Sequence, residues 1–104
     1  MSVAFQPTVY LLASRRNGTL YCGVTSDLLG RIHQHRGGTF DGFTAHHGVK
    51  RLVWFEHHET IESAIQSEKR SKKWRRSWIL ELIEADYPQW RELAEELGFE
   101  PLHP

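Results

Sequence analysis

Cysteine is nearly absent from this chain, with Cys22 the single one among 104 residues. One thiol cannot form an intrachain disulfide, so a disulfide scaffold and a zinc site made of cysteines are excluded. Long apolar runs are also missing, and the longest, such as residues 52–55, are far too short to span a bilayer. Residues 1–4 lack the pattern of a secretory signal. We therefore expect a cytoplasmic protein in a reducing compartment, without a membrane partner.

Net charge is absent as well, because 13 Lys and Arg balance 13 Asp and Glu. The balance hides a division along the chain, since residues 1–80 contain 12 basic and 6 acidic side chains and residues 81–104 contain 1 and 7. The basic body can face phosphate while the acidic tail lies elsewhere, or the two parts can neutralise each other. The length and the 12% of aromatic residues predict one ordered domain over residues 1–104.

Residues 8–14 and 19–25 predict a β-hairpin around Asn17-Gly18, because both turn residues tolerate positive φ. A two-residue turn places Arg16 opposite Thr19, and directly opposite side chains share a face. One face then carries Val9, Leu11, Ala13, Leu20, Cys22 and Val24. The other carries Tyr10, Leu12, Ser14, Tyr21, Gly23 and Thr25. We expect the first face to pack on the core and the second to present two tyrosines, unless a bulge or a longer turn shifts the register to separate them.

Helix signals follow the hairpin. Residues 28–36 predict a helix that begins after candidate N-caps at residues 25–27 and ends at Gly37-Gly38. Arg31 and His35 lie one turn apart on its flank. Arginine suits bidentate phosphate contact and histidine titrates near neutral pH, so the pair is a candidate phosphate site. A solvated helix face is the alternative.

Residues 51–56 predict a third strand, and a second helix begins near Thr60. Its apolar stripe continues onto Glu68, one turn after the positions that define it, Ile61, Ala64 and Ile65. A carboxylate on an apolar stripe is costly unless it is paired, protonated or bound to a cation. Glu68 is therefore a candidate cation ligand. Pairing with a neighbouring Lys or Arg, or a stripe that has rotated outward, is the alternative.

Residues 69–76 form a basic run with Trp74 inside it. The run can follow a phosphate backbone or form a solvated helix face. After a break near Trp74 the apolar pattern resumes at Trp74, Trp78, Leu82 and Ile83. A last helix is expected from Pro88 to Gly98, with a buried stripe of Trp90, Leu93, Ala94 and Leu97.

Two groupings have competing interpretations. Tyr10 and Tyr21 can line a site, or they can simply pack a half-covered sheet face. The seven histidines invite a zinc interpretation, but the adjacent pairs at residues 46–47 and 57–58 cannot easily chelate one ion. We therefore do not expect a histidine zinc site.

Several of these residues resemble a known family in their order and spacing. Thr8-Val9-Tyr10 and Tyr21-Cys22-Gly23, with ten residues between them, are similar to the paired motif of the GIY-YIG nuclease superfamily. Arg31 and His35 match the family's arginine and its histidine or tyrosine. Glu68 falls where the family has its single metal-binding glutamate. The chain is also similar to the nuclease domain of the excision-repair incision subunit.

The resemblance covers about residues 8–90, and residues 48–54 and 74–78 look like the short stand-alone bacterial members. It also has departures, at Thr8, Val9, Cys22, Val24, His47 and Tyr87. The first three are sheet positions where β-tolerant residues suffice. Val24 replaces a cation, His47 replaces a tyrosine, and Tyr87 stands where many members have an asparagine that supports the metal carboxylate.

The resemblance implies an α/β (α+β) fold with a small three-stranded antiparallel sheet flanked by helices. It implies an endonuclease that hydrolyses phosphodiester bonds in nucleic acid, DNA first, in repair or recombination, with one Mg²⁺ or Mn²⁺ held by Glu68. The implied catalytic residues are Tyr10, Tyr21, Arg31 and His35, with Tyr10 preferred as the base. The expected nucleic-acid contacts are Arg31, Lys69, Lys72, Lys73 and Arg76.

Two alternatives remain open at this point. One is a non-catalytic nucleic-acid-binding module of the same fold. The other is a nuclease domain that needs an unidentified targeting protein to select its substrate.

Overall fold

A computed structural model describes residues 6–37 and 48–102. The elements in chain order are β1 (Thr8–Ala13), β2 (Leu20–Thr25), α1 (Leu28–Gly37), β3 (Arg51–His57), α3 (Ile61–Lys72), α4 (Arg76–Asp86) and the 3₁₀ helix η1 (Leu93–Leu97). The strands form one antiparallel sheet in the order β2-β1-β3. The predicted α+β class and the three-stranded sheet are confirmed. The part of the chain described holds no helix that is long and apolar enough to cross a membrane.

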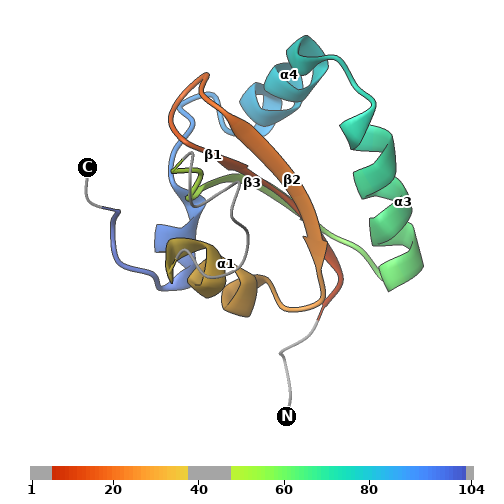
Figure 1. Ribbon diagram of the computed structural model, residues 1–104, viewed down its shortest axis with the longest axis horizontal. Helices are drawn as coiled ribbons and strands as arrows, with labels where there is room; N and C mark the ends of the chain where they lie inside the picture. The colour runs from red at the N-terminus through yellow and green to blue at the C-terminus, as the bar shows by residue number, and fades with distance from the viewer. Residues whose placement is uncertain (1–5, 38–47, 103–104) are drawn as a thin grey trace.

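Helices cover both faces of the sheet, with α1 on one side and α3 on the other (Figure 1). The central strand β1 is buried throughout. Its side chains alternate between two cores: Val9 and Leu11 pack with Ala64 and Ile83 from α3 and α4. The other core, on the side of α1 and η1, contains Tyr10, Leu12, Leu28, Ile32, Leu93 and Ala94. The expectation that only the first face of the hairpin packs on a core is therefore wrong, because α1 and η1 bury the second face too.

The hairpin connection is longer than predicted. The amide of Ser14 donates to the carbonyl of Thr19 at 2.9 Å, and the amide of Gly18 donates to the carbonyl of Arg15 at 2.9 Å. The connection therefore contains residues 15–18 rather than two residues. Asn17 alone takes the left-handed conformation in it, at φ 59°. The side chain of Asn tolerates that region better than most, which is why the turn centres there.

The strand register preserves the predicted pairing of faces in spite of the longer turn. Tyr10 pairs with Gly23 and Leu12 pairs with Tyr21. Paired numbers therefore sum to 33 where a two-residue turn predicts 35. Both sums are odd, so the same residues share a face, and Tyr10 and Tyr21 lie on one side of the sheet as expected.

Helix α3 begins as predicted, with the side chain of Thr60 accepting a hydrogen bond from the Ser63 amide at 3.0 Å. Ala64 is fully buried and the Glu68 side chain is only 12% exposed, so the buried stripe does continue onto a carboxylate. Ile61 is 38% exposed and does not belong to that stripe. In α4, Trp78 is 49% exposed, so its expected place in the apolar pattern is also wrong.

The last predicted helix is reduced to the single short turn of η1. Trp90 has a left-handed φ of 56°, which no α-helix accommodates. The Glu92 carboxylate then accepts from the Ala94 amide at 2.9 Å and from the Leu52 amide at 2.8 Å. It caps η1 and ties it to β3 at the same time. Gly98, at φ 101°, ends the element as expected.

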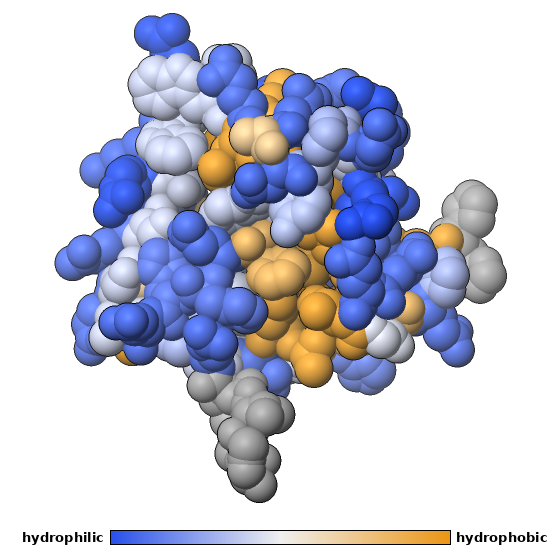
Figure 2. Space-filling model, turned by 180° about the vertical axis from the view of Figure 1, so that it is seen from behind, coloured by the Kyte–Doolittle hydropathy of each residue, from blue (hydrophilic) through white to orange (hydrophobic). Residues whose placement is uncertain are grey.

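Apolar side chains gather on the face that points away from the viewer of Figure 1, as Figure 2 shows. Strands β2 and β3 are the two edges of the sheet, and β2 is the edge nearest the viewer in Figure 1. This edge is where α1 and α3 approach β2 from its two sides, and it carries the polar residues identified in the sequence.

Candidate active site at the β2 edge of the sheet

The ring of Tyr10 lies directly over Gly23, its partner on β2. Tyr10 is 0% exposed. A Cβ atom added at Gly23 would stand 2.5 Å from both Cζ and the hydroxyl oxygen of Tyr10. Real carbon atoms do not approach so closely, so any side chain here displaces the tyrosine ring. Glycine is therefore required at position 23 to seat Tyr10.

We expect Gly23→Ala to destabilise the protein by about 1–3 kcal/mol, the usual cost of overpacking a core. The displaced Tyr10 ring should also disturb its hydrogen bond to His35. Chemical denaturation measures the loss of stability. Leu29→Ala, which shortens a side chain that is 50% exposed on α1, is the control and should keep the parent's stability. A Gly23→Ala protein as stable as the parent would contradict this packing argument.

Tyr10 and His35 are joined by a buried hydrogen bond. The Tyr10 hydroxyl lies 3.1 Å from His35 Nε2, and His35 is 1% exposed. The hydroxyl donates when Nε2 carries no proton. The ring of Tyr21 completes the group, with its centroid 5.4 Å from that of His35 and 6.3 Å from that of Tyr10. Helix α1 thus places His35 against both tyrosines of the hairpin.

Burial raises the pKa of Tyr10 well above the ordinary phenol value, and the neighbouring Tyr21 raises it further. The positive charge of Arg31 and its hydrogen bond to Tyr10 act in the opposite direction but do not prevail. Tyr10 is therefore a neutral phenol near pH 7. Arg31, from the same helix as His35, lies close enough to interact with it.

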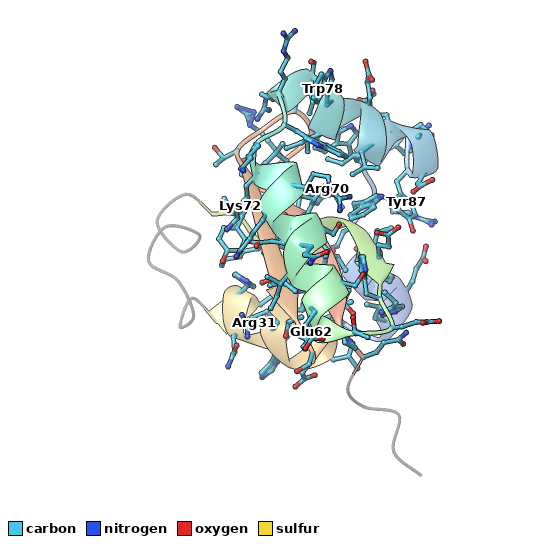
Figure 3. All side chains as sticks on the ribbon, turned by 90° about the vertical axis from the view of Figure 1, so that its right-hand side faces the viewer. Arg31, Glu62, Arg70, Lys72, Trp78 and Tyr87 are labelled. Atoms are coloured by element: carbon cyan, nitrogen blue, oxygen red, sulfur yellow. The ribbon has the colours of Figure 1, made fainter. Side chains whose placement is uncertain are left out.

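Tyr21 lies between this buried group and helix α3. It is partly exposed on the edge strand and lines a cavity of about 290 Å³ together with Lys72. The cavity is completed by Leu11, Leu20, Cys22, Ser71 and Ile79. Figure 3 shows Arg31 from α1 and Lys72 from α3 along the same flank of the molecule. The edge of β2 therefore brings residues from both faces of the sheet toward Tyr21.

Glu68 is paired with Lys72, one turn further along α3. The Lys72 ammonium lies 2.5 Å from a Glu68 carboxylate oxygen, and this hydrogen bond raises the pKa of Lys72. The pairing is one of the alternatives left open by the sequence, and the spacing i, i+4 was its signal. The structure gives no direct contact between Glu68 and Tyr10. Glu68 is connected to the Tyr10–His35 pair indirectly. Its partner Lys72 lines the same cavity as Tyr21, and the Tyr21 ring lies beside Tyr10 and His35.

Cys22 is an unreactive thiol in this setting. Burial raises its pKa to about 11, and the negative charge of Glu68 contributes to the rise. Within residues 6–37 and 48–102, no cluster of three or more His, Cys, Asp or Glu side chains could hold a metal. His46 and His47 lie outside the described residues.

The members of the basic run, residues 69–76, differ in what they contact. Lys69 and Lys73 are exposed. Arg76 instead donates to the carbonyls of Asn17 and Gly18, at 2.9 and 2.6 Å, and so fastens the start of α4 to the hairpin. The sequence offers no local signal for this contact, which joins positions far apart in the chain.

Tyr87, where the resemblance places an asparagine, ends α4 and packs against both cores. Its amide donates to the carbonyl of Ile83 at 2.7 Å. Figure 3 shows Tyr87 on the other side of α3 from Arg31 and Lys72. Its visible role is to pack the junction between α4 and the C-terminal segment.

Comparisons with known proteins bear on the fold and the family. The chain is similar to the UPF0213 protein BH0048 from Bacillus halodurans, whose solution NMR structure it matches with a TM-score of 0.54 at 26% identity. The match covers 91% of this chain and 99% of that one. A search of curated proteins gives no match. The family model of the GIY-YIG catalytic domain matches residues 6–81, which include both tyrosines, Arg31, His35 and Glu68. The chain therefore belongs to the GIY-YIG nuclease family.

Proposed function

We propose that this chain is an endonuclease that uses one divalent metal ion to hydrolyse phosphodiester bonds, with DNA as its substrate. The observation that carries the proposal is the position of Tyr21. It lies in an open cavity, between the Tyr10–His35 pair and the Lys72–Glu68 pair. The phenol of Tyr21, the guanidinium of Arg31 and the carboxylate of Glu68 are thereby gathered at one accessible edge of the sheet. The chain that carries them belongs to a family of nucleases.

The residues present fit a single hard cation. Mg²⁺ and Mn²⁺ prefer oxygen ligands, and Mg²⁺ commonly keeps several waters beside one or two carboxylates and substrate phosphates. Glu68 supplies such a carboxylate, and its pairing with an ammonium supports its capacity to hold positive charge. Lys72 is 55% exposed on a flexible stem and is free to swing aside. A bound ion would stabilise the negative charge of the phosphoryl group and the leaving oxygen.

The other roles follow from exposure and charge. The Arg31 guanidinium suits bidentate contact with a non-bridging phosphate oxygen. Tyr21, partly exposed, is our candidate for the base that takes a proton from the attacking water. The water oxygen bonds to phosphorus as the bond from phosphorus to the leaving oxygen breaks, and the leaving oxygen takes a proton from solvent. Tyr10, preferred on sequence grounds, is fully buried and bonded to His35, which favours a positioning role for it.

The non-catalytic module is a second candidate, and one observation favours it. Lys72 satisfies the Glu68 carboxylate from within the chain, as in a site that no longer needs a metal. Such a module would bind nucleic acid through Arg31 and the exposed lysines. A targeting protein, a role in repair or recombination and a cytoplasmic location are compatible with either candidate.

The proposal is tested by incubating the protein with single-stranded, nicked, branched and duplex DNA and with RNA, each with Mg²⁺, Mn²⁺ or excess chelator. We expect cleavage of at least one DNA substrate that depends on the ion and stops in chelator. Binding without cleavage under every condition would support the non-catalytic module. Cleavage that persists in excess chelator would rule out the metal mechanism.

A further inference from the structure

Trp74, which is half-buried, and Trp78, which is 49% exposed, form an aromatic pair at the junction of α3 and α4. Their ring centroids are 6.3 Å apart at an angle of 78°. The Arg75 guanidinium lies 5.7 Å from the centre of the Trp78 ring. Neither tryptophan belongs to either of the two hydrophobic cores. Large aromatic side chains that the fold does not bury point to a contact with something outside the chain.

The two other tryptophans show the contrast. Trp54 and Trp90 are 7% and 1% exposed, and their indole N–H groups donate to the carboxylates of Asp86 and Glu84, both on α4. Within residues 6–37 and 48–102, the structure gives no hydrogen-bond acceptor to the indole of Trp78. Its ring is therefore held in place by its neighbours Trp74 and Arg75 rather than by the core.

A shallow cavity of about 420 Å³ lies beside this pair. Its lining consists of Trp74, Trp78, Glu81, Leu82 and Ala85. The volume falls within the range of about 300–1,000 Å³ that small ligands occupy. The walls are mainly flat aromatic rings and aliphatic side chains, which suits a planar group better than a charged one.

The cavity adjoins the densest positive charge of the chain. Six of the eight residues from Lys69 to Arg76 are Lys or Arg. Figure 3 shows Lys72 and Trp78 in succession along the flank that α3 and α4 form, with Arg31 of α1 below them. A phosphate backbone that starts at Arg31 and follows this flank would arrive at the tryptophan pair. An apolar protein segment would gain nothing from the same cations.

We propose that Trp78, supported by Trp74 and Arg75, stacks an unpaired nucleobase, so that the protein holds a single-stranded segment of its substrate. This inference rests on the proposed function and narrows its substrate class. Tryptophan rings stack any base, and a duplex offers no free base face to them. The substrate is therefore nucleic acid with a single-stranded stretch beside the cleaved bond.

The test measures binding in chelator, so that no strand is cut. Its probes are a single-stranded oligothymidylate, the same length of abasic strand and a duplex. We expect the oligothymidylate to quench tryptophan fluorescence and to bind more tightly than the abasic strand. Trp78→Ala should weaken oligothymidylate binding by roughly 5- to 150-fold, the effect of losing one stacked base, and should leave the abasic strand and the duplex unaffected. Trp78→Phe should retain most of the affinity.

Two further variants separate stacking from charge and from simple exposure. Lys73→Glu should flatten the dependence of binding on salt by about one unit of slope per lost phosphate contact, whereas Trp78→Ala should leave that slope unchanged. Leu29→Ala removes a side chain that is 50% exposed on α1, and it should bind every probe like the parent.

Three results would overturn the inference. If Trp78→Ala binds oligothymidylate like the parent, no base stacks on the Trp78 ring, and a protein partner becomes the better explanation of its exposure. An equal loss for the abasic strand would mean that Trp78 contacts the backbone. If the parent binds none of the probes, the proposed function fails along with the inference. In the first two cases the parent can still cleave DNA, and the inference alone fails.

Discussion

Glu68→Gln is expected to abolish both divalent-ion binding and cleavage while the fold is kept. Glutamine has the shape of glutamate but no charge, so it cannot hold a hard cation against water. The side chain is 12% exposed and its partner Lys72 is 55% exposed. The exposed Lys72 ammonium can turn to water once its partner is neutral, so the variant should unfold near the parent's midpoint. Calorimetric titration with Mn²⁺ and a cleavage assay measure the two losses.

Glu62→Gln is the matched control for this experiment. Glu62 lies in the first turn of the same helix, is exposed, and appears at the far end of α3 from Lys72 in Figure 3. It should bind Mn²⁺ and cleave like the parent. Lys72→Met removes the ammonium that occupies Glu68 and should tighten Mn²⁺ binding. Unchanged Mn²⁺ binding by Glu68→Gln would show that Glu68 is not the ligand.

Tyr21→Phe is expected to lower the single-turnover cleavage rate by roughly 10²–10⁴-fold, the contribution of a general base. The substitution removes only the hydroxyl from a partly exposed ring, so stability should change little. Single-turnover kinetics with saturating protein measure the effect apart from substrate binding. Tyr87→Phe removes a hydroxyl from a tyrosine outside the site and should cleave like the parent.

Tyr10→Phe is the informative comparison, because it should act mainly on stability. It removes the buried hydrogen bond between Tyr10 and His35, at a cost of about 1–3 kcal/mol. Burial raises the pKa of Tyr10, so the parent should lose stability as the pH rises above the ordinary phenol pKa near ~10. Tyr10→Phe should reduce that alkaline loss. If Tyr10→Phe, still folded, shows the 10²–10⁴-fold loss and Tyr21→Phe does not, then Tyr10 is the base. If neither slows cleavage, both tyrosines are packing residues.

Local sequence determined most of the elements and much of the site's order. The residue numbers of paired positions in the hairpin have an odd sum for a turn of two residues and for a turn of four. Tyr10 and Tyr21 therefore lie on one face of the sheet in either case. The start of α3 at Thr60 and the position of Glu68 on its buried stripe follow from capping and periodicity. These features depend on neighbours within a few positions, which is the range that a sequence pattern reports.

Contacts between distant segments decided the rest. The packing of α1 and η1 over the second face of the sheet buries Tyr10, and the strand pattern carries no sign of that cover. Glu92 binds the Leu52 amide on β3 and so limits the expected last helix to one short turn. Trp78 is exposed because α4 turns Ile83 toward the core instead. Each outcome depends on which side of an element another element covers, and periodicity alone does not specify that choice.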